Sequence, residues 1–115
     1  MTQATIDRAT FQALEEAAGA DFVLELVGTF LVEAPAMIDD LRSAFAANDA
    51  DRFRRAAHSL KSNSMTFGAL TLGAMARSLE QGGIDPVRQA GGEPLDQLAD
   101  EYARVAQALS ELRNA

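Results

Sequence analysis

Apolar residues recur every three or four positions along most of this 115-residue chain, and this spacing constrains the fold more than any other feature. In the last segment, for example, they fall at Leu95, Leu98, Tyr102, Val105, Leu109 and Leu112. Such a stripe forms one face of an amphipathic helix. Residues that favour helix, such as Ala, Leu and Glu, are plentiful, and the three prolines are far apart. We therefore expect an all-α protein.

The same periodicity predicts five helices, at about residues 7–18, 21–47, 50–67, 70–81 and 94–113. Residues 82–94 are rich in glycine and proline and are predicted to be a surface loop. Pro35 falls inside the second helix, where we expect a kink or a break into two coaxial pieces. The expected fold is an antiparallel up-down four-helix bundle with a short extra N-terminal helix, in one domain that spans residues 1–115.

Several classes of protein are disfavoured by composition. There is no cysteine, so the chain has neither a disulfide framework nor a thiolate metal site. It has no run of about 18 apolar residues and no secretory signal pattern at its start, so we expect a cytoplasmic protein that does not enter a membrane. The formal net charge of −7 argues against nucleic-acid binding.

Positive charge is concentrated in one part of this otherwise acidic chain. Between Arg52 and Leu79 there is no acidic residue, so this stretch carries +5 and the remainder carries −12. Its basic residues are Arg52, Arg54, Arg55, Lys61 and Arg77. The only histidine, His58, lies within the stretch, three residues before the only lysine, Lys61. We call Arg52 to Leu79 the basic stretch.

His58 is expected to face water. The apolar residues of its helix are Phe53, Ala56, Ala57, Leu60 and Phe67. At 100° per residue, His58 points roughly 150° away from the centre of that apolar face. The residues expected near it on the exposed side are Arg54, Arg55, Lys61, Ser62 and Met65.

An exposed histidine of this kind is compatible with few roles. A metal site needs several ligands, and there is no second histidine and no cysteine. A Ser-His-acid triad needs a carboxylate beside the imidazole, but no acid lies near His58 in its own helix, and Ser59 points elsewhere. Two roles remain: a surface residue without function, or a nucleophile that carries a phosphoryl group and is open to another protein's active site.

The segment "AHSLKSNSMTFGA" resembles the signature of histidine-containing phosphotransfer (HPt) domains, broadly A-H-x-L-K-G/S followed by small or polar residues and then x-G-A. The preceding segment, with its Glu33-Ala34-Pro35 run and its short acidic turn, also looks like the family. The resemblance is close from about residue 22 to residue 79.

The resemblance implies a four-helix bundle that exposes His58 as the phosphorylated nucleophile. Lys61 matches the family lysine and would stabilise the phosphoryl group. Ser62 stands where the family most often has glycine, so it would leave room for a partner, while its hydroxyl could hydrogen-bond the imidazole. Gly68 matches the family's helix-ending glycine and needs no chemical role. We expect Arg54, Arg55, Ser62 and Met65 to form the docking surface for receiver domains.

The expected function is that of a phosphorelay intermediate in two-component signalling. His58 would carry phosphate between receiver-domain aspartates, or from a sensor histidine kinase, such as a hybrid kinase, to a receiver. The chain has no glycine-rich phosphate loop followed by lysine, so we expect no ATP-dependent kinase activity. We expect no cofactor of its own, Mg²⁺ on the partner receiver, and a monomer. The alternatives are a noncatalytic bundle that docks on receiver or kinase domains, and a bundle without a signalling role.

Overall fold

The computed structural model describes residues 5–114, and within them all regular structure is helical. The helices are α1 (Arg8–Ala18), α2 (Ala20–Ala47), α3 (Ala50–Thr66), α4 (Leu70–Gly82), α5 (Ile84–Gln89) and α6 (Glu93–Asn114). None of them is long and apolar enough to cross a membrane. The expected all-α class is confirmed, whereas the predicted domain limits, residues 1 and 115, lie outside the described residues.

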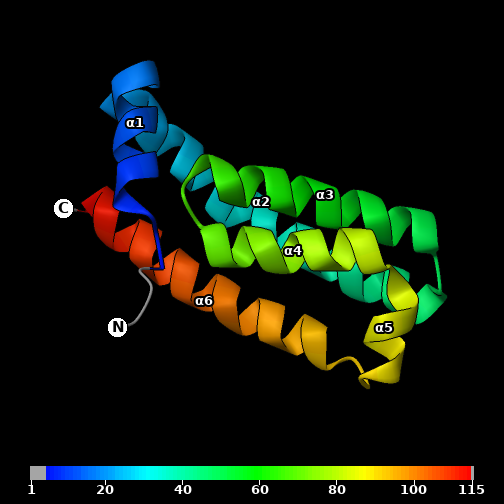
Figure 1. Cartoon of the computed structure of the whole chain (residues 1–115). Helices are drawn as coiled ribbons and strands as arrows, with labels where there is room; N and C mark the ends of the chain where they lie inside the picture. The colour runs from blue at the N-terminus through cyan, green and yellow to red at the C-terminus, as the bar shows by residue number, and fades with distance from the viewer. Residues whose placement is uncertain (1–4, 115) are drawn as a thin grey trace.

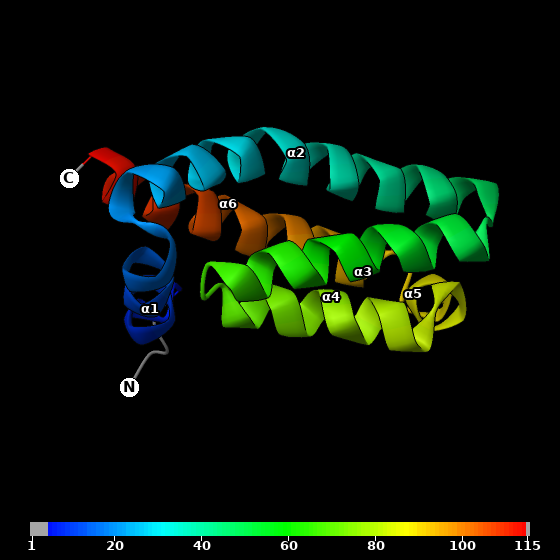
Figure 2. The ribbon, with the colours of Figure 1, turned by 90° about the horizontal axis from the view of Figure 1, so that it is seen from above.

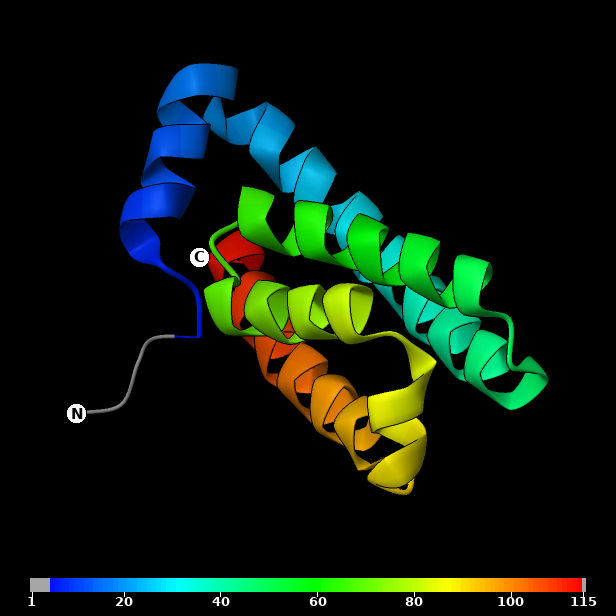
Figure 3. The same cartoon turned by 45° about the vertical axis from the view of Figure 1, so that its right-hand side comes forward.

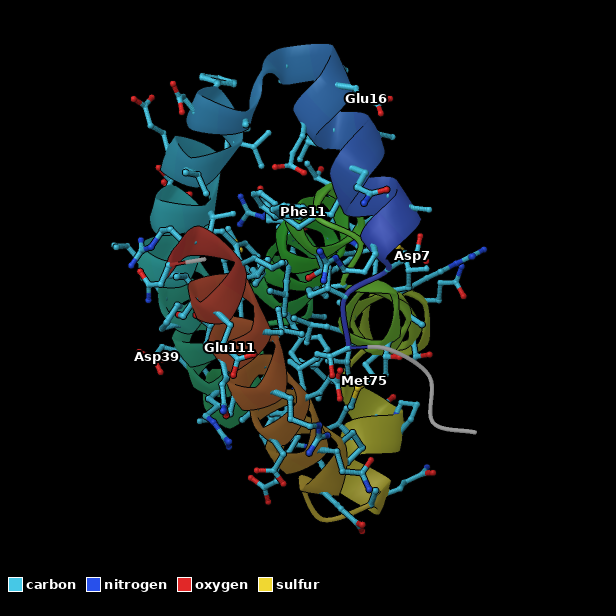
Figure 4. The ribbon with its side chains drawn as sticks, turned by 90° about the vertical axis from the view of Figure 1, so that its left-hand side faces the viewer. Asp7, Phe11, Glu16, Asp39, Met75 and Glu111 are labelled. Atoms are coloured by element: carbon cyan, nitrogen blue, oxygen red, sulfur yellow. The ribbon has the colours of Figure 1, made fainter. Side chains whose placement is uncertain are left out.

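Four of the helices, α2, α3, α4 and α6, run alternately up and down and form the bundle (Figure 1). α3 packs between α2 and α4, and α6 contacts both α2 and α4 (Figure 2). The short α1 crosses one end of the bundle (Figure 3). It directs Phe11, which is almost fully buried, toward the interior (Figure 4).

The apolar stripes explain the core. All five apolar residues predicted for α3 are buried, and the largest fully buried side chains of the other bundle helices include Leu41, Leu72, Leu95, Leu98 and Leu109. Phe22 of α2, although large and apolar, is 51% exposed. It is the third residue of α2, and Figure 2 shows that the start of α2 extends past the neighbouring ends of α3 and α4.

Residues 84–89 form helix α5, so the prediction of a loop over residues 82–94 was wrong there. Ile84 and Val87 are three residues apart, lie on one side of this short helix, and are both buried. Pro86 falls in the first turn of α5, where the absence of a backbone N–H costs nothing. Burial of two β-branched side chains thus outweighs the turn signals of the surrounding glycines.

Pro35 does not break α2, which is one continuous helix from Ala20 to Ala47. Proline has no N–H, so the carbonyl oxygen four residues earlier, that of Leu31, loses its usual helical donor. The Tyr102 hydroxyl of α6 lies 3.3 Å from that oxygen and donates to it. Burial raises the pKa of Tyr102, which keeps the hydroxyl protonated as a donor. A neighbouring helix therefore replaces the bond that Pro35 removes.

Gly68 has a role beyond ending α3. Its φ of +84° is a conformation that side-chain-bearing residues rarely adopt. Its carbonyl oxygen accepts a 2.8 Å hydrogen bond from the Asp7 amide at the start of α1. A Cβ atom on residue 68 would lie only 2.7 Å from the Asp7 carbonyl oxygen. Gly68, near the end of the AHSLKSNSMTFGA segment, therefore also allows α1 to dock.

Replacing Tyr102 with phenylalanine should lower the free energy of unfolding by about 1 kcal/mol, because the Leu31 carbonyl loses its donor. In a Pro35→Ala background the same replacement should cost clearly less, since the backbone N–H is restored. Urea unfolding of the four proteins measures both effects. Equal costs in the two backgrounds would show that the Tyr102 hydroxyl does not compensate for Pro35.

Candidate functional site

His58 lies on the outer face of α3, near the middle of that helix. Phe53, Ala57 and Leu60 are fully buried and fix the rotation of α3 about its own axis. Their burial leaves the His58 side chain 58% exposed. The predicted orientation of the histidine toward water is therefore confirmed.

The imidazole contacts a carboxylate from the neighbouring helix. Glu80 of α4 places Oε2 2.6 Å from His58 Nδ1, and its Oε1 accepts a hydrogen bond from Lys61 Nζ at 2.9 Å. The Glu80 side chain is only 20% exposed and that of Lys61 only 26%. One carboxylate thus joins the only histidine and the only lysine of the chain.

Sequence reasoning missed Glu80. No acid lies near His58 in its own helix; Glu80 is 22 residues further along the chain and reaches the histidine only because α3 and α4 are antiparallel neighbours. One signal was available: Glu80 is the first acid after the basic stretch and lies near the end of the helix predicted over residues 70–81.

The charge state of Glu80 determines the tautomer of His58. The hydrogen bond from Lys61 holds the pKa of Glu80 below its ordinary value of 4.5, and the hydrogen bond with His58 lowers it further, against partial burial, which raises it. At neutral pH Glu80 is therefore an ionised carboxylate, which can only accept hydrogen bonds. Nδ1 must carry the proton, so in the neutral imidazole Nε2 holds the free lone pair.

Ser62 does not hydrogen-bond the imidazole within the described part of the chain, so the expectation that its hydroxyl biases the tautomer is replaced by the contact from Glu80. A Ser-His-acid triad still lacks its serine, because no hydroxyl in residues 5–114 bonds His58. Those residues also contain no cluster of three or more His, Cys, Asp or Glu side chains suited to hold a metal ion. The site is a single oriented imidazole with a lysine nearby.

The other predicted site residues, Arg54, Arg55, Ser62 and Met65, are all exposed on α3. Arg54 and Arg55 line a hollow of about 340 Å³ together with His58, Ser59 and Glu80. Met65 is 37% exposed, and its side chain lies over Gly73 of α4, where a Cβ atom would come within 2.9 Å of its sulfur. The structure thus brings the arginines to His58 and places Met65 further along α3.

The contribution of Glu80 to stability should depend on pH. Because its pKa is lower in the folded protein, its ionised form stabilises the fold above about pH 4.5, and this stabilisation is lost as the pH falls through the folded-state pKa. Glu80→Gln should therefore be less stable than the wild type at neutral pH, and the difference should shrink in acid. Denaturant unfolding at a series of pH values measures this; a difference independent of pH would contradict it.

Comparison with known proteins agrees with this arrangement. The sequence matches the family model of the Hpt domain over residues 25–115. No curated protein matched the chain significantly.

Two solved structures are similar to the chain. The crystal structure of histidine-containing phosphotransfer protein B (HptB) from Pseudomonas aeruginosa PAO1 is 26% identical, with a TM-score of 0.88 over 98% of this chain and 97% of that one. The HPT domain of a sensor hybrid histidine kinase from Shewanella is 17% identical, with a TM-score of 0.76 over 94% and 92% of the two chains. The fold, the family model and the exposed histidine agree, and the chain belongs to the Hpt domain family.

Proposed function

We propose that this domain is a phosphorelay intermediate that carries a phosphoryl group on Nε2 of His58. The observation that carries the proposal is the bond between His58 Nδ1 and the Glu80 carboxylate, in a domain of the Hpt family. This bond keeps the proton on Nδ1, so the free lone pair of the exposed imidazole is on Nε2, the nitrogen that can face a partner. The similarity to a histidine-containing phosphotransfer protein at 26% identity supports the same function.

In the proposed transfer, the lone pair of His58 Nε2 attacks the phosphorus of an aspartyl phosphate on a receiver domain. The N–P bond forms, the P–O bond to the aspartate breaks, and that oxygen leaves with the bonding electrons as part of a carboxylate. The product is a phosphorylated imidazole that still bears a proton on Nδ1 and is therefore cationic at the ring. Glu80 stabilises this ring charge through its 2.6 Å contact. The reverse reaction delivers phosphate to a second receiver.

Lys61 is proposed to stabilise the phosphoryl group. Its ammonium lies one helical turn from His58 and in the resting domain is held by Glu80. Phosphorylation would add close to two negative charges beside it. Lys61 has three donor hydrogens, so it can bond the phosphoryl oxygens without fully leaving Glu80.

The proposed partners are response-regulator receiver domains, with a hybrid sensor histidine kinase as a further donor. The acidic pocket and Mg²⁺ needed for aspartate chemistry would belong to the receiver, and this domain would supply the nucleophile and positive charge. We propose that the domain acts as a monomer in the cytoplasm and does not use ATP itself.

His58→Gln should abolish phosphoryl acceptance from a labelled receiver domain. The fold should survive, because the side chain is exposed and the glutamine amide can still donate to Glu80. Acid-labile, alkali-stable label on the wild type but not on the variant is the expected result, with unchanged helicity as the control. Persistent transfer to the variant would show that His58 is not the nucleophile. Receiver binding by both proteins without any transfer would favour the noncatalytic docking module.

Lys61→Ala should slow phosphoryl transfer by about ten- to a hundredfold, which corresponds to about 1–3 kcal/mol for a charge-assisted contact at a partly exposed site. Lys61→Arg keeps the charge and serves as the matched control, with most of the rate retained. Single-turnover kinetics at saturating receiver concentration isolate the transfer step. If Lys61→Ala changed only the concentration of receiver needed for half-maximal rate, the lysine would act in docking instead.

A further inference from the structure

The positive charge of the basic stretch is largely neutralised in space. Its first three arginines face two carboxylates: Arg52 lies 2.8 Å from Asp40, and Arg54 and Arg55 lie 2.6 and 3.3 Å from Asp51. Its lysine is held by Glu80. The five cations and these three carboxylates together leave a net charge of only +2.

Arg77 is the exception. It is exposed on α4, and within residues 5–114 its side chain makes no ion pair and no hydrogen bond. Two contacts fix the register of α4 against α3: Met65 lies over Gly73, and His58 meets Glu80. These pairs are seven residues apart on each helix, as expected for antiparallel neighbours, and Figures 1 and 3 show the two helices side by side.

The register places Arg77 beside the site. It follows Gly73 by four residues and precedes Glu80 by three, so it lies on the same side of α4 between them. The corresponding place on α3, between the two contacts, is that of Lys61. Packed helix axes are about 8–10 Å apart, a span that an extended arginine side chain covers in large part. Arg77 therefore lies across from Lys61, about one helical turn from His58, whereas the hollow beside His58 is lined by Arg54 and Arg55.

We propose that Arg77 is the principal electrostatic contact of this domain for the acidic pocket of its receiver partner, in place of Arg54 and Arg55. This rests on the proposed function, which supplies a partner of that charge. Asp51 is shared by Arg54 and Arg55, at 2.6 and 3.3 Å, and offsets one of their two charges, so an approaching carboxylate gains less from each of these arginines than from an unpaired one. A guanidinium that is not paired with a carboxylate attracts the receiver carboxylate without an opposing charge beside it and offers two parallel donors.

The proposal predicts different effects for arginines that look alike in sequence. Arg77→Gln should lower kcat/KM for phosphotransfer about three- to tenfold at low salt and flatten its salt dependence, with the saturated rate nearly unchanged. Arg54→Gln and Arg55→Gln should each change kcat/KM less than about twofold. Arg77→Lys should restore most of the loss. Arg8→Gln, a loss of the same charge on α1, controls for net charge.

The experiment uses the intact chain and the receiver domain of its own organism that exchanges phosphate with it fastest. Binding of the same receiver to unphosphorylated wild type and variants is measured in parallel by fluorescence anisotropy. Weaker receiver binding by Arg77→Gln, and by no other variant, supports the proposal. Phosphate acceptance by His58→Gln would overturn the proposed function but not this proposal, because the binding measurement does not depend on phosphorylation. Loss of binding in Arg54→Gln or Arg55→Gln with none in Arg77→Gln overturns the proposal, as does an equal loss in Arg8→Gln.

Asp51→Asn gives an independent check. It removes the carboxylate that both Arg54 and Arg55 contact and leaves their positions on α3 unchanged. If the ion pairs with Asp51 weaken the attraction of these arginines for the receiver, Asp51→Asn should bind the receiver more tightly. Adding Arg54→Gln to Asp51→Asn should then weaken binding clearly. An unchanged affinity in Asp51→Asn would show that ion pairing does not determine which arginine acts.

Discussion

The packing of α3 against α4 is the contact on which the site depends. Burial of Ala57 and Leu60 on one side and of Leu72 and Ala76 on the other leaves no freedom for either helix to rotate. The antiparallel register that results brings Glu80 to His58, two residues that no local segment contains. Neither residue has a defined chemical state without the other helix. The tautomer of the imidazole is thus a property of the bundle.

The choice of a carboxylate at position 80 has chemical consequences. A neutral amide could also orient the ring, but either of its two ends can face the histidine. An ionised carboxylate accepts only, so it specifies which nitrogen bears the proton, and it would favour the cationic ring formed in the proposed phosphorylation. Lys61 keeps Glu80 ionised through the hydrogen bond that lowers its pKa. The lysine would then serve the transfer twice, through the phosphoryl group and through the carboxylate.

Features that depend on one helix could be predicted from the sequence, and those that depend on two could not. The exposure of His58 follows from the apolar periodicity of α3 alone, and the N-terminal cap of that helix follows from Asp49, whose carboxylate accepts from the Arg52 amide. Glu80 and the neutralisation of Arg52 by Asp40 require the register between helices. α5 was not predicted because glycine and proline surround its two buried residues, Ile84 and Val87. The continuity of α2 was not predicted because Tyr102, which bonds the carbonyl left without a donor by Pro35, lies far away in the sequence.

Small residues line the helix contacts around the site. Ala56 and Ala57 of α3, Ala69 just before α4 and Ala76 of α4 are buried, and Gly73 accommodates the Met65 side chain. Burying an alanine freezes no side-chain rotamer, so this part of the core becomes ordered at a low cost in conformational entropy. It also has few alternative packings, because a methyl group has no other rotamer to adopt. His58, the proposed nucleophile, is therefore carried on helices whose small buried side chains have few or no alternative rotamers.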